Sequence, residues 1–151
     1  MSYKNTRGAI GQYASVKNAA GIEEASPHRL IQMLMEGALE KIAQAKGFME
    51  GGDIPNKGRH ISWAISIIDG LRISLDKDAG GDIAENLDSL YEYMTRRLVE
   101  ANLRNDKSIL EEVSGLIIEI KSAWDAIPED VRKQARQPVE EGAQDKVSVI
   151  G

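Results

Sequence analysis

The residues of this chain that could do chemistry are few, and their spacing does not bring them together. Cysteine is absent, and the two histidines are His28 and His60. Di-iron sites in helical bundles need a Glu-x-x-His pair on each of two helices. Neither histidine lies three residues after a glutamate, so both are interpreted as surface residues near helix starts. The sequence therefore predicts no metal site.

Acid–base catalysis and phosphate binding are not supported either. The carboxylate pairs Glu23-Glu24, Glu111-Glu112 and Glu140-Glu141 are adjacent in sequence. Neighbouring residues on a helix point to different faces, which suits solvation better than catalysis. The glycine-rich turns lack a preceding strand and a Lys-Ser or Lys-Thr ending, so no phosphate loop is present. We expect no enzyme activity and no cofactor.

Composition narrows the class of protein further. The chain has 151 residues, 42% of them hydrophobic, and a net charge of −5. This size favours one domain, and the acidic balance argues against nucleic-acid binding. No apolar run reaches the ~18 residues of a membrane span, and the N-terminus lacks the apolar core of a signal peptide. We expect a soluble cytoplasmic protein with no membrane insertion.

The elements around these residues are predicted to be four long amphipathic helices after a shorter N-terminal one. Apolar residues recur at steps of three and four, which is the helical period. The short helix covers about residues 3–18. The long ones run from Ser26-Pro27 to Gly51-Gly52, from the cap Asp53 to just before Ala79, within residues 80–106, and from the cap Asp106 to Pro128.

Short connections between long helices force antiparallel neighbours. The sequence thus predicts an all-α protein, an antiparallel up-down four-helix bundle with an extra N-terminal helix. One bundle domain should occupy residues 1–127. Residues 1–20 are expected to be a mobile segment, since glycines weaken their helix, and they carry three basic and no acidic side chains. Residues 128–151 are expected to be a polar, disordered tail.

The apolar stripes are wider than a four-helix core requires. Trp63 and Ile67 lie about a third of a turn from the main stripe of their helix, and Tyr91 and Tyr93 flank the stripe of the next. A wide stripe indicates either a helix packed against two neighbours or an apolar groove that awaits a further helix. Both interpretations stay open from the pattern alone.

A set of short sequence motifs resembles those of a known protein family. They are Ala25-Ser26-Pro27-His28, Leu30-Ile31, Met33-Leu34, Gly37-Ala38, Lys57-Gly58, Ile67-Ile68-Asp69, Leu75-Asp76, Gly80-Gly81, Asn86-Leu87, Leu90-Tyr91, Tyr93-Met94, Arg96-Arg97-Leu98, Ala101 to Asp106, Glu111-Glu112-Val113 and Ala123-Trp124. These motifs occur in one unbroken order over about residues 8–127. In them the chain resembles the bacterial flagellar secretion chaperones of the FliS family.

The resemblance implies a non-enzymatic function. Such a chaperone binds the disordered C-terminal region of flagellin, prevents its premature polymerisation and delivers it to the flagellar type III export gate. Binding would order the client, so a large apolar interface must offset the entropy lost. The alternative is a self-associating structural or adaptor bundle with a different protein client. A homodimer is compatible with either.

The resemblance and the stripes together give candidate interaction residues. For engagement of the cytoplasmic domain of the export-gate protein, the resemblance implies Ile10 and Tyr13. For the flagellin groove, we expect residues of the helix that starts at Asp53 and of the helix within residues 80–106, namely Trp63, Ile67, Leu87, Tyr91, Met94, Leu98 and Asn102.

Overall fold

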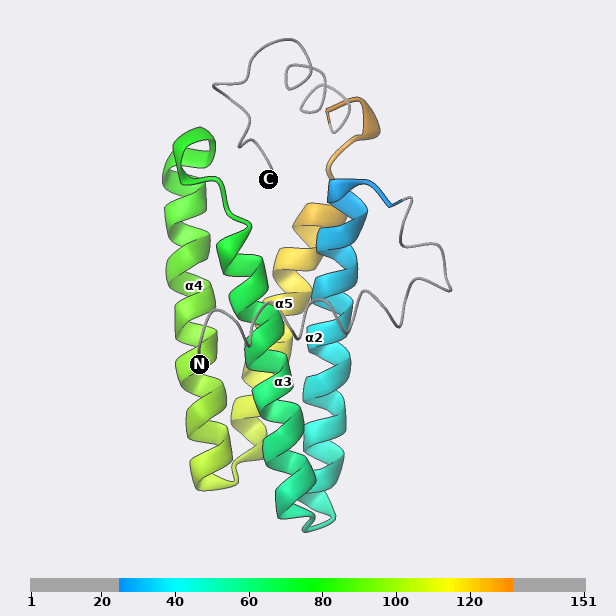
Figure 1. Cartoon of the computed structure of the whole chain (residues 1–151), viewed down its shortest axis with the longest axis vertical. Helices are drawn as coiled ribbons and strands as arrows, with labels where there is room; N and C mark the ends of the chain where they lie inside the picture. The colour runs from blue at the N-terminus through cyan, green and yellow to red at the C-terminus, as the bar shows by residue number, and fades with distance from the viewer. Residues whose placement is uncertain (1–24, 132–151) are drawn as a thin grey trace.

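The computed structural model describes residues 25–131, and within them the chain forms four helices joined by short turns. They are α2 (Pro27–Glu50), α3 (Ile54–Ile73), α4 (Lys77–Arg104) and α5 (Lys107–Asp125). Figure 1 shows them running alternately down and up, with α2 beside α3 and α5, and α4 beside the same two helices. This confirms the all-α, antiparallel bundle. The predicted N-terminal helix and the tail beyond residue 131 lie outside the described residues.

Local signals explain where each helix begins. Ser26, Asp53 and Asp106 cap α2, α3 and α5, because each side chain accepts a hydrogen bond from a backbone N–H of the first turn. These three caps confirm the predicted starts. The start of α4 differs from the prediction, since Asp76 caps a helical turn that begins at Lys77.

The double glycine lies inside α4 rather than before it. Gly81 has φ 54° and ψ −130°, a backbone conformation that only glycine adopts without strain. It breaks the helix after its first turn, and the regular part of α4 follows. The third predicted helix also ends earlier than expected, at Ile73, with Ser74 as its C-cap.

The bundle has an upper and a lower end, at which different parts of the four helices meet. The upper end holds the start of α2, the end of α3, the start of α4 and the end of α5, and lies at the top of Figure 1. The lower end holds the α2–α3 and α4–α5 turns. Buried apolar side chains from all four helices form one continuous core between the ends. None of the helices within residues 25–131 combines the length and apolarity needed to cross a bilayer.

Candidate functional site

The seven predicted groove residues divide into two groups by exposure. Ile67, Met94 and Leu98 are 0% exposed and Tyr91 is 3% exposed. Their side chains belong to the core that joins the helices, so in this arrangement they stabilise the bundle and offer no surface to a partner. A partner could reach these side chains only if the helices separated. Their role in a groove stays a prediction.

The phenol of Tyr91 shows how complete this burial is. Removal from water raises the pKa of its hydroxyl to about 12, because burial disfavours the charged phenolate. Tyr91 is therefore neutral throughout the physiological range and takes part as a packing residue. The structure gives it no acid–base role.

Trp63 reaches the surface between α2 and α3. Its ring lies under the Lys41 ammonium, with Nζ 3.7 Å from the ring centroid. The His60 ring stands 6.1 Å from Trp63 and 4.9 Å from Phe48, centroid to centroid. The indole Nε1 of Trp63 is buried without a hydrogen-bond acceptor among the described residues. These contacts leave one aromatic and cationic patch on the α2–α3 face, which suits a partner with an acidic or aromatic group.

Asn102 instead belongs to a hydrogen-bonded group at the lower end, which is called the Lys57 lock and consists of Lys57, Asn102 and Asn105. The buried Lys57 ammonium donates to the Asn102 carbonyl at 3.1 Å and to the Asn105 side-chain oxygen at 2.9 Å. Asn105 is the C-cap of α4, and its backbone has the left-handed conformation, with φ 53°. The Asn102 amide group also lies within 4 Å of where a Cβ on Gly58 would stand. These residues belong to the motifs of the family resemblance, but no pattern along the sequence indicates that a lysine of one helix binds the turn after another helix.

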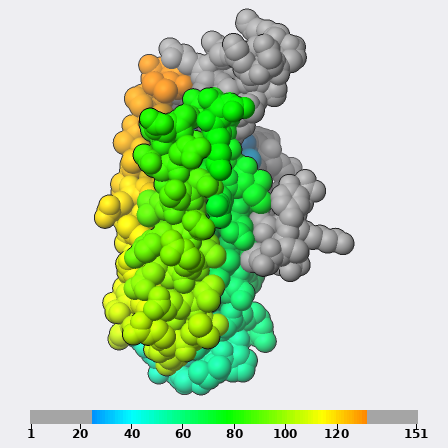
Figure 2. All heavy atoms as spheres, turned by 90° about the vertical axis from the view of Figure 1, so that its left-hand side faces the viewer, coloured from blue at the N-terminus to red at the C-terminus, as the bar shows by residue number. Residues whose placement is uncertain are grey.

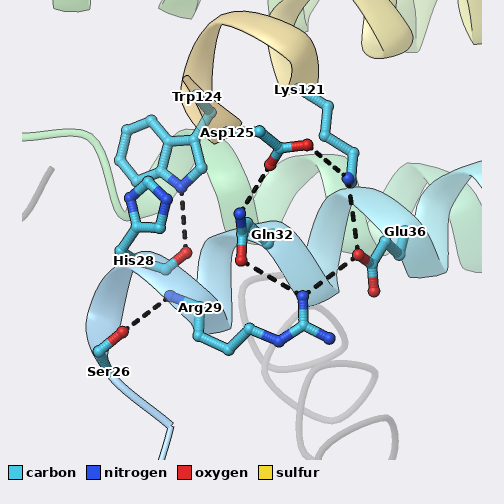
Figure 3. Close-up of polar contacts among 8 residues, drawn as sticks. All are labelled: Ser26, His28, Arg29, Gln32, Glu36, Lys121, Trp124 and Asp125. Atoms are coloured by element: carbon cyan, nitrogen blue, oxygen red, sulfur yellow. Dashed lines mark hydrogen bonds and ion pairs between the residues drawn. The ribbon is translucent and has the colours of Figure 1, made fainter. Parts of the chain in front are cut away.

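A second polar network closes the seam between α2 and α5 at the upper end (Figure 3). Lys121 bridges Asp125 at 2.8 Å and Glu36 at 3.6 Å, and Gln32 donates to Asp125 at 2.7 Å. Lower on the same seam, Lys46 pairs with Glu111 and Lys107 with Glu50. This seam is therefore held by polar contacts along its length.

His28 corrects a sequence prediction. It was expected at the surface, yet it is 7% exposed and stacks on Trp124 with 4.8 Å between ring centroids and 9° between planes. The Trp124 Nε1–H donates to the His28 carbonyl at 3.0 Å. The stacked rings join the start of α2 to the end of α5, which makes His28 a structural residue. Within residues 25–131, no group of three or more histidines and acids is placed to hold a metal.

Exposed apolar side chains mark the surfaces on which the described part of the chain can meet a partner. On α4 they are Ile83, Val99 and Leu103, with 71%, 47% and 79% of each side chain exposed. Ile73 of α3 and Ile118 of α5 are each about half exposed. Leu87, from the predicted groove, is half-buried against the core.

Comparison with known proteins supplies the family. Residues 9–131 match the family model described as flagellar protein FliS. The chain belongs to the FliS family. The FliS match covers most of the sequence and includes Ile10 and Tyr13, which lie outside the described residues and whose role remains a prediction.

Individual FliS relatives agree with the family match. The flagellar secretion chaperone FliSB of Pseudomonas aeruginosa is 57% identical over 119 residues, which are 79% of this chain and 94% of that protein. The flagellar secretion chaperone FliS of Salmonella typhimurium is 49% identical over 81% of this chain and 91% of its own. That of Vibrio cholerae is 46% identical over 81% and 90%. FliS membership implies a chaperone with flagellar protein partners and a non-enzymatic role.

Proposed function

We propose that this chain is the export chaperone that binds the disordered C-terminal region of flagellin in the cytoplasm. It prevents premature polymerisation and delivers flagellin to the type III export gate. The observation that carries the proposal is apolar surface left over after the bundle is assembled, with Ile83 and Leu103 of α4 more than two-thirds exposed, in a chain of the FliS family. A client segment that becomes helical would cover such surface.

The proposed binding mechanism is coupled folding and binding. The bundle supplies a rigid frame, since its core residues and its inter-helix ion pairs are already in place. The client is the flexible partner. Its ordering costs several kcal/mol, and the burial of apolar surface must offset this cost. No nucleotide or metal enters this mechanism, and release would follow handover at the gate.

The remaining assignments within this function rest on the sequence. Ile10 and Tyr13 engage the cytoplasmic domain of the export-gate protein. Trp63, with its patch of Lys41 and His60, contacts the client from the α2–α3 face. Neither assignment requires nucleic acid or insertion into a membrane.

The test is a titration of the full chain with a peptide covering the last ~40–50 residues of the host's flagellin, long enough for several helical turns. Calorimetry should give tight binding with a negative heat-capacity change, and far-UV circular dichroism should show a gain of helix. Absence of binding at tens of micromolar would overturn the flagellin assignment. Concentration-dependent mass without peptide binding would favour the self-associating adaptor instead.

A further inference from the structure

The seam between α4 and α5 is closed at its middle and opens toward the upper end. The Tyr93 hydroxyl and the Arg97 guanidinium of α4 both donate to the Glu112 carboxylate of α5. Leu90 and Ile83 precede Arg97 by seven and fourteen residues, so helical periodicity places them on the side of α4 that faces α5. Leu90 is half-buried, and Ile83 is 71% exposed. The α4 side of the seam is therefore apolar and increasingly uncovered toward the upper end.

The α5 side of the seam opens in the same direction. Leu116, Glu119 and Ala123 follow Glu112 at steps of four, three and four residues, so they lie on the side of α5 that faces α4. Leu116 is half-buried, whereas Glu119 and Ala123 are exposed. Figure 1 shows α4 and α5 diverging toward the upper end, and Figure 2 shows α5 in yellow and orange along one edge of α4. We name the upper seam by its four residues Ile83, Leu90, Leu116 and Ala123.

The chain continues beyond the FliS match, and this continuation starts near the upper seam. The family match and the described part of the structure both end at Val131. We name residues 132–151 the extension. Because α5 ends at Asp125, at the upper end of the bundle, the extension begins a few residues from that end.

Apolar residues gather within residues 147–150 of the extension. They are Val147, Val149 and Ile150, with Ser148 between the two valines. In an extended backbone this alternation places both valines on one face. A segment this short has no core of its own, so contact with other apolar surface is the way in which it can leave water. The upper seam offers such surface.

The charges of the extension are complementary to those beside the upper seam. Arg132, Lys133 and Arg136 lie in its first five residues, without an acid among them. Glu119, on the α5 side of the seam, and Asp82, next to Ile83 on α4, are both exposed. Opposite charges across a contact favour association and fix its orientation. The basic start of the extension therefore suits a path along the seam.

Tethering makes even a weak contact effective. Residues 132–146 join Val131 to the apolar residues. A flexible chain of about 15 residues has a root-mean-square span of roughly 20 Å, which is about the width of two helices. The effective concentration of a segment on such a tether is of the order of 1 mM. A segment that binds the seam with a Kd below about 1 mM would thus occupy it most of the time.

We propose that residues 147–150 dock on the upper seam of the same molecule, guided by the basic start of the extension. The occupant is a segment of this chain, and the contact needs neither a client nor a second copy. A partner that uses the upper seam must first displace the extension, so the contact is autoinhibitory. This inference does not rest on the proposed function.

The first test is thiol labelling, which the absence of cysteine from the sequence makes specific. Ala123→Cys introduces one thiol on the upper seam, and Ala43→Cys introduces one at an exposed site in the lower half of α2. In the full chain without client, the double change Val149→Ser, Ile150→Ser should raise the labelling rate of the Ala123→Cys thiol at least about threefold, because a covered group reacts only while it is uncovered. The Ala43→Cys thiol should keep its rate within about 1.5-fold.

The controls separate the contact from general effects. Val139→Ser changes a β-branched residue of the extension outside residues 147–150 and should leave the labelling rate of the Ala123→Cys thiol unchanged. Ile83→Ser should raise that rate as much as the double change in the extension. Combining Ile83→Ser with the double change should add nothing, since both would break one contact. Equal melting temperatures will show that the variants fold.

A second test concerns the charges. With the native extension, the labelling rate of the Ala123→Cys thiol should rise with salt concentration, because salt screens exposed charges. Glu119→Gln should weaken this dependence. Glu85→Gln is the control, since Glu85 is exposed and lies two residues from Ile83, on the opposite side of α4.

Three outcomes would overturn the proposal. The first is an unchanged labelling rate of the Ala123→Cys thiol in the double variant Val149→Ser, Ile150→Ser. The second is an equal rise at the Ala43→Cys thiol, which would indicate a general loosening of the bundle. The third is a labelling rate that falls as protein concentration rises, because the occupant would then be the extension of a second copy.

Discussion

The lower and upper ends of this bundle are built differently. At the lower end the core is sealed, with Leu98, Ala101 and Leu110 at 0% exposed and the Lys57 ammonium tying the α4–α5 turn to α3. At the upper end the stripes of α4 and α5 run on into half-buried and exposed residues. The main stripes of α4 and α5 are thus enclosed at the lower end and partly open to water at the upper end, although Leu103 at the lower end is also exposed.

Truncations along α4 should give the largest effect and test this comparison directly. Leu98→Ala, at the sealed end, should lower the free energy of unfolding by about 2–5 kcal/mol, because it leaves a cavity in a fully packed core. Leu87→Ala, at the half-covered end, should cost clearly less. Urea denaturation of both variants measures the difference. Equal losses would mean that the upper end is packed as tightly as the lower.

The Lys57 lock should give the next largest effect. Lys57→Ala removes both hydrogen bonds to the end of α4 and leaves their acceptors without the ammonium. We expect a loss of about 1–3 kcal/mol in the free energy of unfolding. Arg59→Ala, an exposed neighbour on α3, is the control and should change stability by less than about 0.5 kcal/mol. Thermal denaturation can measure both losses. Equal losses for Lys57→Ala and Arg59→Ala would show that the Lys57 hydrogen bonds do not stabilise the fold.

The Asp88 pair should give a smaller and pH-dependent effect at the upper end. Hydrogen bonding to Arg72 lowers the pKa of the Asp88 carboxyl below its ordinary value, with Lys77 adding to the shift. Since the folded-state pKa is depressed, the pair stabilises the fold above the unfolded pKa of about 3.9, and this stability is lost as pH falls through the folded pKa. Both partners touch solvent, so we expect at most about 1 kcal/mol.

The measurement for this pair is the free energy of unfolding at pH 7 and at about pH 3, by urea denaturation. Asp88→Asn should lower stability at pH 7, and its difference from wild type should shrink as pH falls below the unfolded pKa. Glu85→Gln, an exposed acid one turn away, serves as the control and should show no such convergence. A constant difference for Asp88→Asn at both pH values would assign its role to packing.

The smallest effect is expected for Leu103→Ala. The side chain is 79% exposed and leaves almost no contact to lose, so the change in unfolding free energy should stay within about 0.5 kcal/mol. Differential scanning calorimetry can measure it. A larger loss would show that exposed apolar residues at the lower end also support the fold, and the contrast between the two ends would weaken.

Much of the fold could be predicted from the sequence, because its signals are local. Helical periodicity and the caps Ser26, Asp53 and Asp106 act within one or two turns, and the structure confirms them. The cap Asp76 differs from the prediction, because the Gly80-Gly81 pair is the stronger local signal for a helix boundary. The structure places that boundary inside α4, where Gly81 breaks the helix after one turn.

The division between core and surface could not be predicted in the same way. Periodicity gives the side of a helix on which Ile83 and Met94 lie, but not how far the neighbouring helices extend. Only the packing of the folded bundle shows that Met94 is enclosed and Ile83 is not. His28 illustrates the same limit, since its burial depends on Trp124, which is 96 residues away in the chain.

The stacked rings of His28 and Trp124 have a consequence for observing this protein in solution. An indole packed face to face on an imidazole, at 4.8 Å, reports by its fluorescence on whatever separates or protonates that neighbour. The sequence contains two tryptophans, so Trp63→Phe would leave Trp124 as a single optical reporter of the junction between α2 and α5. Its emission could then follow events at the upper end without any attached label.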